Sequence, residues 1–186
     1  TLNSLQVNGA QGLSVSGSGR VPLSGDGLSV DVNAQVPLAL GNAFVPDQNL
    51  GGTVTGTARV TGALRNPAAS FNLQGSGITA APLAQAGVAP LSVQAEGAYG
   101  DNAVTLNSLQ VNGAQGLTVS GNGRVPLSGD GLSVNVDAQA PLAIANRFLA
   151  DRGTQLSGTV NANATVTGSI QQPNIQGRVT SAGAAV

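Results

Sequence analysis

Residues 1–44 recur almost unchanged as residues 105–148, and both copies alternate polar with apolar side chains. Of the 44 positions, 8 differ. Four differences exchange polar residues, two exchange aliphatic residues, and two fall where the alternation ends; the pairs are Ser14/Thr118, Ser18/Asn122, Asp31/Asn135, Asn33/Asp137, Val36/Ala140, Leu40/Ile144, Gly41/Ala145 and Ala43/Arg147. A period of two is typical of a strand with one apolar face. The duplication therefore predicts a long sheet with one continuous apolar surface.

Each copy contains two alternating runs that are separated by a glycine-rich turn. In the first copy the runs are 13–23 and 28–40, with Ser24-Gly25-Asp26-Gly27 between them, and residues 128–131 repeat this turn. An Asp-Gly pair between alternating runs favours a β-hairpin, because the turn needs a positive φ. We therefore predict a hairpin at both places.

A second alternating unit follows each copy. It runs over residues 54–73 with a break at Arg65-Asn66-Pro67, and over 160–179 with a break at residues 171–174. The offset here is 106 residues instead of 104, so we place a two-residue insertion in a loop, where strand repeats tolerate it. Altogether we expect about ten strands of roughly 6–12 residues.

Other segments interrupt the alternation. Residues 81–90 and 143–152 are rich in alanine without a period of two, and we expect short helical turns there. Six Val/Ala-Pro-Leu triplets occur, and proline cannot donate to a strand ladder. The prolines within strand-like runs should therefore mark strand ends, bulges or edges; they are Pro22, Pro37, Pro126 and Pro141.

The composition argues against catalysis and against nucleic-acid binding. Charged residues make up 8% of the chain, the net charge is −1, and the seven basic residues are scattered arginines, so there is no basic stripe. The chain has no His, Lys or Cys to act as a base, a nucleophile or a soft metal ligand, and its acids are dispersed. We therefore expect no catalytic residues, no metal and no cofactor, and a chain that is not an enzyme.

Glycine-rich segments could be taken for ligand loops. Gly17-Ser-Gly19 and Gly75-Ser-Gly77 do not complete a phosphate-loop pattern, so they favour close strand packing. The Asp-Gly turns supply too few oxygens for a calcium site.

The ends of the chain predict a fragment. No apolar run of about twenty residues could cross a membrane as a helix, and no signal peptide is present. The chain starts without Met inside a repeat. We expect it to be a piece of a longer protein, with any anchor elsewhere.

The apolar face itself is the main functional signal. It could be an ordinary core that a second sheet seals, as in a sandwich. However, aromatic residues are only 2% of the chain, and Val, Leu, Ala and Gly would make a smooth surface without hydrogen-bonding groups. Such a surface suits acyl chains, since about 0.8 kcal/mol per buried methylene amounts to about 12 kcal/mol for sixteen carbons.

The candidate groove residues are the large aliphatic side chains of the alternating runs. They are Leu13, Val15, Val21, Leu28, Val30, Val32, Val36, Leu38, Val54, Val60, Leu64, Leu91, Val93, Leu117, Val119, Val125, Leu132, Val134, Val136, Val160, Val166 and Ile170.

Three segments resemble a known family. Residues 52–67 and their copy 158–173 both consist of a strand, a Val-Thr-Gly turn and a short break that ends in proline. The third segment is the link at residues 145–153, which precedes the copy. These patterns are similar to the TamB-like inner-membrane subunit of the bacterial translocation and assembly module, within the wider AsmA-like group.

The resemblance implies a fold, a location and partners. The fold is an elongated all-β sheet folded lengthwise into a half-pipe or taco with an apolar interior. The location is the periplasmic portion of an inner-membrane-anchored Gram-negative protein. The partners are phospholipid, an outer-membrane barrel protein and client outer-membrane proteins.

The leading hypothesis is therefore a non-enzymatic segment of a periplasm-spanning protein. Its groove would carry phospholipid acyl chains or chaperone outer-membrane β-barrel and autotransporter proteins. Residues 1–104 and 105–186 would be two repeat blocks of one continuous domain. The main alternative is a tandem-repeat adhesin or secreted β-solenoid with a sealed core, and a secreted hydrolase is a third, remote one.

Overall fold

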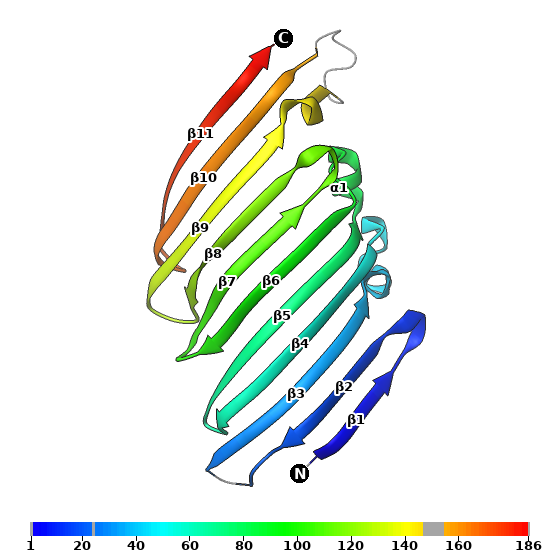
Figure 1. The fold of residues 1–186 in the computed structure, drawn as a ribbon, viewed down its shortest axis with the longest axis vertical. Coiled ribbons are helices and arrows are strands. Elements are labelled where there is room, and N and C mark those ends of the chain that lie inside the picture. Colours follow the sequence, from blue (N-terminus) through cyan, green and yellow to red (C-terminus); the bar gives the residue numbers. More distant parts are fainter. Residues whose placement is uncertain (1, 24, 147–154, 186) are drawn as a thin grey trace.

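The computed structural model describes residues 2–23, 25–146 and 155–185. They form eleven strands of a single open sheet, in which every neighbouring pair is antiparallel and the spatial order equals the chain order. The two termini therefore lie at opposite ends of the sheet (Figure 1). The strands are β1 Leu2–Asn8, β2 Ser14–Arg20, β3 Asp26–Pro37, β4 Gly51–Ala63, β5 Asn66–Thr79, β6 Leu91–Gly100, β7 Ala103–Asn112, β8 Thr118–Pro126, β9 Asp130–Pro141, β10 Ser157–Ser169 and β11 Pro173–Ala185.

The all-β prediction is confirmed, with one strand more than the expected ten and lengths of 7 to 14 residues. The sheet passes without interruption from the first block to the second, because β6 pairs with β7 along its length up to Gly100↔Ala103. The division at residue 104 falls inside β7, and the two-block organisation stays a prediction.

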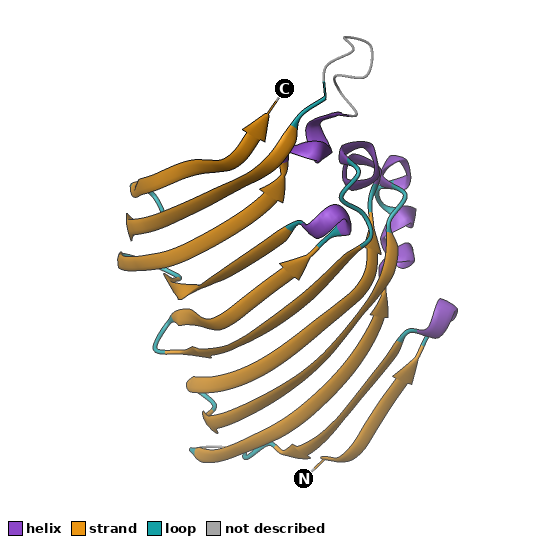
Figure 2. Ribbon diagram, turned by 45° about the horizontal axis from the view of Figure 1, so that its top comes forward, coloured by secondary structure: helices purple, strands orange, loops and turns teal. Residues whose placement is uncertain are grey.

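The two long sides of the sheet differ. On one side, which we call the hairpin rim, turns of two to five residues join the strands, as at Leu64–Arg65 between β4 and β5. On the other side, the connector rim, every link contains a helical turn (Figure 2). The helical turns are η1 Ala10–Gly12, η2 Leu38–Ala43, η3 Pro46–Gln48, α1 Ala81–Ala86, η4 Ala114–Gly116 and η5 Leu142–Ala145. None of the helices in the described ranges has the length and apolarity to cross a membrane.

The expected helical turns are found where the structure describes the chain. In the segment 81–90, α1 covers Ala81–Ala86 and ends at Gly87, whose φ of 74° is the left-handed value that suits glycine. In the segment 143–152, η5 spans Leu142–Ala145, while residues 147–152 lie outside the described residues.

The predicted hairpins form, but the Asp-Gly pairs lie just beyond the turns. Asp26 and Asp130 are the first residues of β3 and β9. The register against β4 shifts between Asp26 and Leu28, so Gly27, with a φ of 101°, makes a bulge at the strand start. Ser24, which we expected in the turn, lies outside the described residues.

The break predicted at Arg65-Asn66-Pro67 is also shorter than expected. Asn66 and Pro67 already belong to β5, and Pro173 already belongs to β11.

The four prolines of the strand-like runs confirm the expectation that they mark strand ends. Pro37, Pro126 and Pro141 are the last residues of β3, β8 and β9. Pro22 follows the last residue of β2 by two positions. A residue without an N–H interrupts the ladder, which explains these positions.

The sheet has almost no sealed core. Among the described residues, the buried hydrophobic ones are Val88 and Ala103. The accessible surface is 11276 Å², whereas about 8,000 Å² is expected for a globular protein of this mass. A single layer with both faces uncovered accounts for the excess. This arrangement does not favour the alternative of a solenoid or adhesin with a sealed core.

Candidate functional site: the apolar face

The pairing register aligns apolar residues in rows that cross the sheet. One row receives a residue from every strand: Val7, Val15, Ala34, Gly56, Leu73, Ala95, Leu109, Gly121, Val136, Ala164 and Gly177. Directly paired residues point to the same side of a sheet. The alternation of single strands thus becomes one face, which we call the apolar face.

Three further rows run beside the first. One contains Gly17, Val32, Ala58, Phe71, Gly97, Leu106, Gly123, Val134, Val166 and Ile175. The next contains Gly19, Val30, Val60, Ala69, Tyr99, Val104 and Val125. The last contains Val36, Val54, Gly75, Val93, Val111, Val119, Ala138, Ala162 and Val179.

Most of the predicted groove residues lie in these rows or on the same strand faces. Leu28 and Leu132 face Gly62 and Gly168, Leu91 faces Ile78, and Val160 faces Ala140. The remaining predicted residues lie where strands meet their links: Leu13, Leu38 and Leu117 at the connector rim, and Val21, Leu64 and Ile170 at the hairpin rim. Whether these residues bind a ligand stays a prediction.

Several members of the face were missing from the predicted set. They include Leu5 and Val7 on β1 and Val104, Leu106, Leu109 and Val111 on β7. The registers shift between Leu2 and Leu5 and between Leu106 and Leu109, so the alternation changes phase in the middle of both strands. The extra residue of a bulge moves the side chains that follow it to the opposite face, so a search for strict alternation does not recognise the strand. The same change of phase occurs in both copies of the sequence, and it could have indicated the bulge.

Large side chains fill the space above the glycines of the apolar face. A Cβ built on Gly56 would lie 2.6 Å from Leu73 Cδ2, and one on Gly75 would lie 2.6 Å from Ile78 Cδ1. In both places a large neighbouring side chain occupies the space that the glycine leaves, which levels the surface. The prediction that Gly17 and Gly19 mark close strand packing holds for Gly19, because a Cβ there would collide with the Ser29 carbonyl. It does not hold for Gly17, where a Cβ would lie 3.5 Å from the Asp31 carbonyl oxygen, an ordinary contact.

No second layer covers the apolar face in the described part of the chain. Exposed fractions are 53% for Leu5, 40% for Leu73, 66% for Ile175 and 71% for Val179. Tyr99 is the one residue in the four rows whose side chain has a polar group. The face can therefore bury hydrocarbon, and it offers almost no directional contact.

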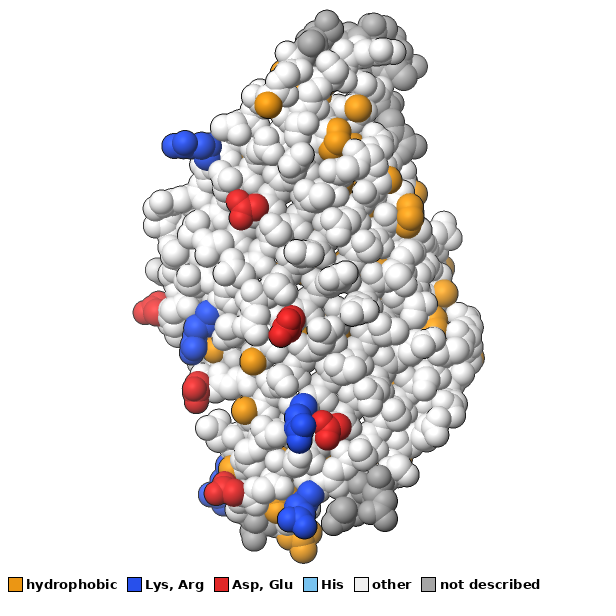
Figure 3. Space-filling view, in the orientation of Figure 1, with side chains coloured by type: hydrophobic (Ala, Val, Ile, Leu, Met, Phe, Trp, Pro, Cys, Tyr) orange, Lys and Arg blue, Asp and Glu red, His pale blue; other side chains and the backbone are white. Residues whose placement is uncertain are grey.

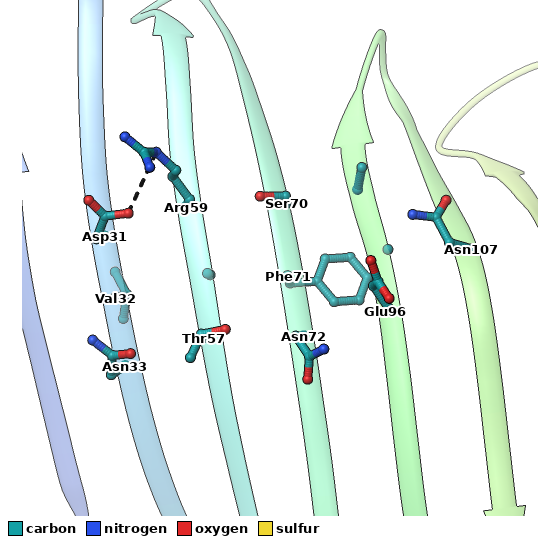
Figure 4. Close-up of a pocket in the computed structure, with 13 residues that line it drawn as sticks. Asp31, Val32, Asn33, Thr57, Arg59, Ser70, Phe71, Asn72, Glu96 and Asn107 are labelled. Atoms are coloured by element: carbon teal, nitrogen blue, oxygen red, sulfur yellow. Dashed lines mark ion pairs between the residues drawn. The ribbon is translucent and has the colours of Figure 1, made fainter.

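The opposite face is polar. Figure 3 shows this face with charged side chains scattered over it and hydrophobic ones mostly toward its margins. It contains a shallow hollow of about 310 Å³, whose labelled lining includes Asp31, Arg59, Asn72, Glu96 and Asn107 (Figure 4). Arg59 Nε lies 3.6 Å from Asp31 Oδ1. In the described part of the chain, no three His, Cys, Asp or Glu side chains gather as a metal site would require.

Residues 107–186 match the family model of the TamB C-terminal domain. The match confirms the predicted resemblance of this chain to the TamB-like family. The matched range contains residues 107–148, which is the second copy of the duplicated segment without its first two residues. Residues 3–44 of the first copy are nearly identical to these matched residues. The wider AsmA-like grouping stays a prediction. No curated protein and no solved structure was found to match the chain.

Proposed function

From the TamB-like resemblance, we propose that the chain is a non-enzymatic segment of a protein associated with the translocation and assembly module, and that its apolar face carries phospholipid acyl chains. The observation that supports this most is the register, which lines up apolar residues from all eleven strands into one uncovered face. An acyl chain needs a continuous apolar surface and no specific partner atoms.

Energetics favours a long, smooth binding surface. Each methylene that leaves water contributes about 0.8 kcal/mol, so a sixteen-carbon chain has about 12 kcal/mol available before the costs of binding. Because the rows consist mainly of Val, Leu, Ala and Gly, a bound chain exchanges similar contacts as it shifts along the sheet. Binding without a fixed position is what a lipid conduit requires.

The finer parts of the proposal concern shape and location. In the longer protein, the sheet would fold lengthwise into a half-pipe with the apolar face inside. Eleven strands at about 4.8 Å spacing span only about 53 Å, so several such blocks would follow one another across the periplasm. An inner-membrane anchor and contact with an outer-membrane barrel protein would come from the full-length chain.

Client outer-membrane proteins are the second candidate ligand. The supporting observation is that both sheet edges, β1 and β11, have one unpaired side. An extended client strand could add there while its apolar side chains continue the face.

The test is purification of the chain from a Gram-negative host without detergent, followed by native mass spectrometry. We expect the mass spectrum to contain complexes of the chain with phospholipid. We also expect the fluorescence of a lipophilic dye to rise when the protein is added and to fall again when phospholipid displaces the dye. A chain that carries no lipid and gives the dye no site would contradict the lipid function.

A further inference from the structure

A hollow of about 440 Å³ lies at the hairpin rim between two neighbouring turns. Leu23 and Gly25 line it from the β2–β3 turn, and Ala63, Leu64 and Arg65 line it from the end of β4 and the β4–β5 turn. We call it the rim notch. Leu23 is 103% exposed and Leu64 is 42% exposed. The rim notch therefore places solvent-exposed aliphatic side chains beside the guanidinium of Arg65.

The second copy has an equivalent hollow with different chemistry. It measures about 280 Å³, and Leu127, Gly129 and Ile170 take the places of Leu23, Gly25 and Leu64. Gln171 lies where the first copy has Arg65. The apolar part of the notch is thus repeated, whereas the positive charge lines only the first hollow and the carboxylate of Asp130 lines the second.

The Arg65 side chain is available to an external anion. Among the described residues the ion pair is between Arg59 and Asp31, on the polar face, and Arg65 has no carboxylate partner. The polar hollow around Arg59 also contains Glu96, so its positive charge is already offset. A carboxylate also lies beside the rim notch, because Asp26 follows Gly25 and is directly paired with Ala63. In the described part of the chain, however, no ion pair joins Asp26 to Arg65, so the guanidinium is open to an anionic group.

Other groups also make the hairpin rim the polar end of the apolar face. The phenol of Tyr99 comes from the end of β6, next to the turn at residues 101–102. Leu64 lies in the turn directly after Gly62 of the apolar face and Ala63, which is paired with Asp26 and Asn66 on the polar face, so the notch lies at the margin where the two faces meet. The described residues of the connector rim, in contrast, carry one charge, that of Asp47.

We propose that the rim notch holds the headgroup of an anionic phospholipid, with its phosphate at Arg65 and its acyl chains on the apolar face toward the connector rim. This inference rests on the proposed lipid-carrying function and adds a headgroup class and an orientation. The amphiphilic lining, aliphatic beside cationic, matches an anionic phospholipid better than it matches a neutral lipid or a soluble anion.

The test compares lipids bound to the full chain after incubation with vesicles of phosphatidylglycerol and phosphatidylethanolamine in equal parts. Native mass spectrometry gives the ratio of the two bound lipids and the total bound. Arg65→Gln should lower the ratio about fivefold and leave the total unchanged, because one basic residue near a lipid phosphate contributes about 1 kcal/mol. Gln171→Arg should raise the ratio. Arg178→Gln, on β11 and away from the rim notch, is the charge-matched control and should change nothing.

The possible results separate the two proposals. A ratio that Arg65→Gln leaves unchanged, or that Arg178→Gln lowers equally, would overturn the headgroup site while lipid binding stands. Absence of any bound lipid on the unmodified chain would instead contradict the proposed function. Inorganic phosphate in excess should hardly compete, since it has no acyl chains. If it abolishes the preference for phosphatidylglycerol, the notch is a site for free phosphate and the lipid assignment is wrong.

Discussion

Asp31 on β3 and Arg59 on β4 are directly paired across the sheet, with Oδ1 and Nε 3.6 Å apart. At the equivalent positions of the second copy, the Thr165 hydroxyl donates to Asn135 Oδ1 at 3.0 Å. Both partners changed together between the copies, and a cross-strand contact is present in each. The polar face therefore depends on paired side chains rather than on this particular charge pair.

The first prediction follows from the exposure of this ion pair. The side chains of Arg59 and Asp31 are 61% and 51% exposed, so solvent screens their attraction. Arg59→Gln should lower the free energy of unfolding by about 0.5 kcal/mol or less. Urea denaturation at low and high salt measures this, with Arg178→Gln as the control. A loss above about 2 kcal/mol would show that the pair holds the sheet together.

The second prediction concerns the packing of glycine against Phe71. A Cβ on Gly97 would lie 2.6 Å from Phe71 Cζ and 2.5 Å from the Thr105 carbonyl oxygen. Gly97→Ala should therefore destabilise the chain by about 1–3 kcal/mol, because the ring and a strand backbone must both move. Gly100→Ala on the same strand meets only Ala68 Cβ at 4.0 Å and should be neutral or slightly stabilising. Equal urea midpoints for the two variants would contradict this packing.

The third prediction concerns the amide that closes the β3–β4 connector. Asn42 Nδ2 donates to the Leu50 carbonyl at 2.9 Å, and the Leu50 N–H donates to Asn42 Oδ1 at 2.7 Å. Asn146 and Leu156 repeat both bonds at 2.9 and 2.6 Å. Asn42→Ala should cost about 1–3 kcal/mol, because two part-buried backbone groups lose their partner.

Asn42→Asp separates the two bonds of this clamp. It retains the acceptor for the Leu50 N–H and loses the donor, so it should cost less than Asn42→Ala. Urea denaturation and hydrogen exchange of the Leu50 amide measure both effects. If neither variant alters stability or exchange, the clamp plays no part in closing the connector.

The sequence was sufficient to predict the strands that alternate without interruption. Val30 and Val32 on β3, and Val134 and Val136 on β9, lie on the predicted face because both strands pair with their neighbours without a register shift at these positions. The insertion predicted from the change in offset lies inside the loop that Asn146 and Leu156 close, 10 residues apart against 8 for Asn42 and Leu50.

Local irregularities were harder to predict. The bulges at 107–108 and at Gly27 depend on pairing with a neighbouring strand, which a local pattern does not contain. The rim notch was also beyond prediction, because Leu23 and Arg65 are far apart in sequence and meet only through the β2–β3–β4–β5 order.

The central claim is that the apolar face is an open binding surface, and Val134 is the residue to test it. Val134 lies in the interior of the sheet, paired with Gly123 on β8 and Val166 on β10, and is partly exposed. An arginine there can extend its head into solvent, so Val134→Arg should fold. The guanidinium should displace about two methylenes of a bound chain, which lowers lipid affinity about tenfold. Gln139→Arg, on the polar face of the same strand, is the matched control.

The most direct measurement is phospholipid binding by these two variants beside their urea unfolding curves. We predict that Val134→Arg keeps a cooperative transition within about 1 kcal/mol of the unmodified chain and loses most of its bound lipid, while Gln139→Arg changes neither. If Val134→Arg unfolds the chain, the face is a sealed core. If it folds and binds lipid as before, the apolar face is not where lipid binds.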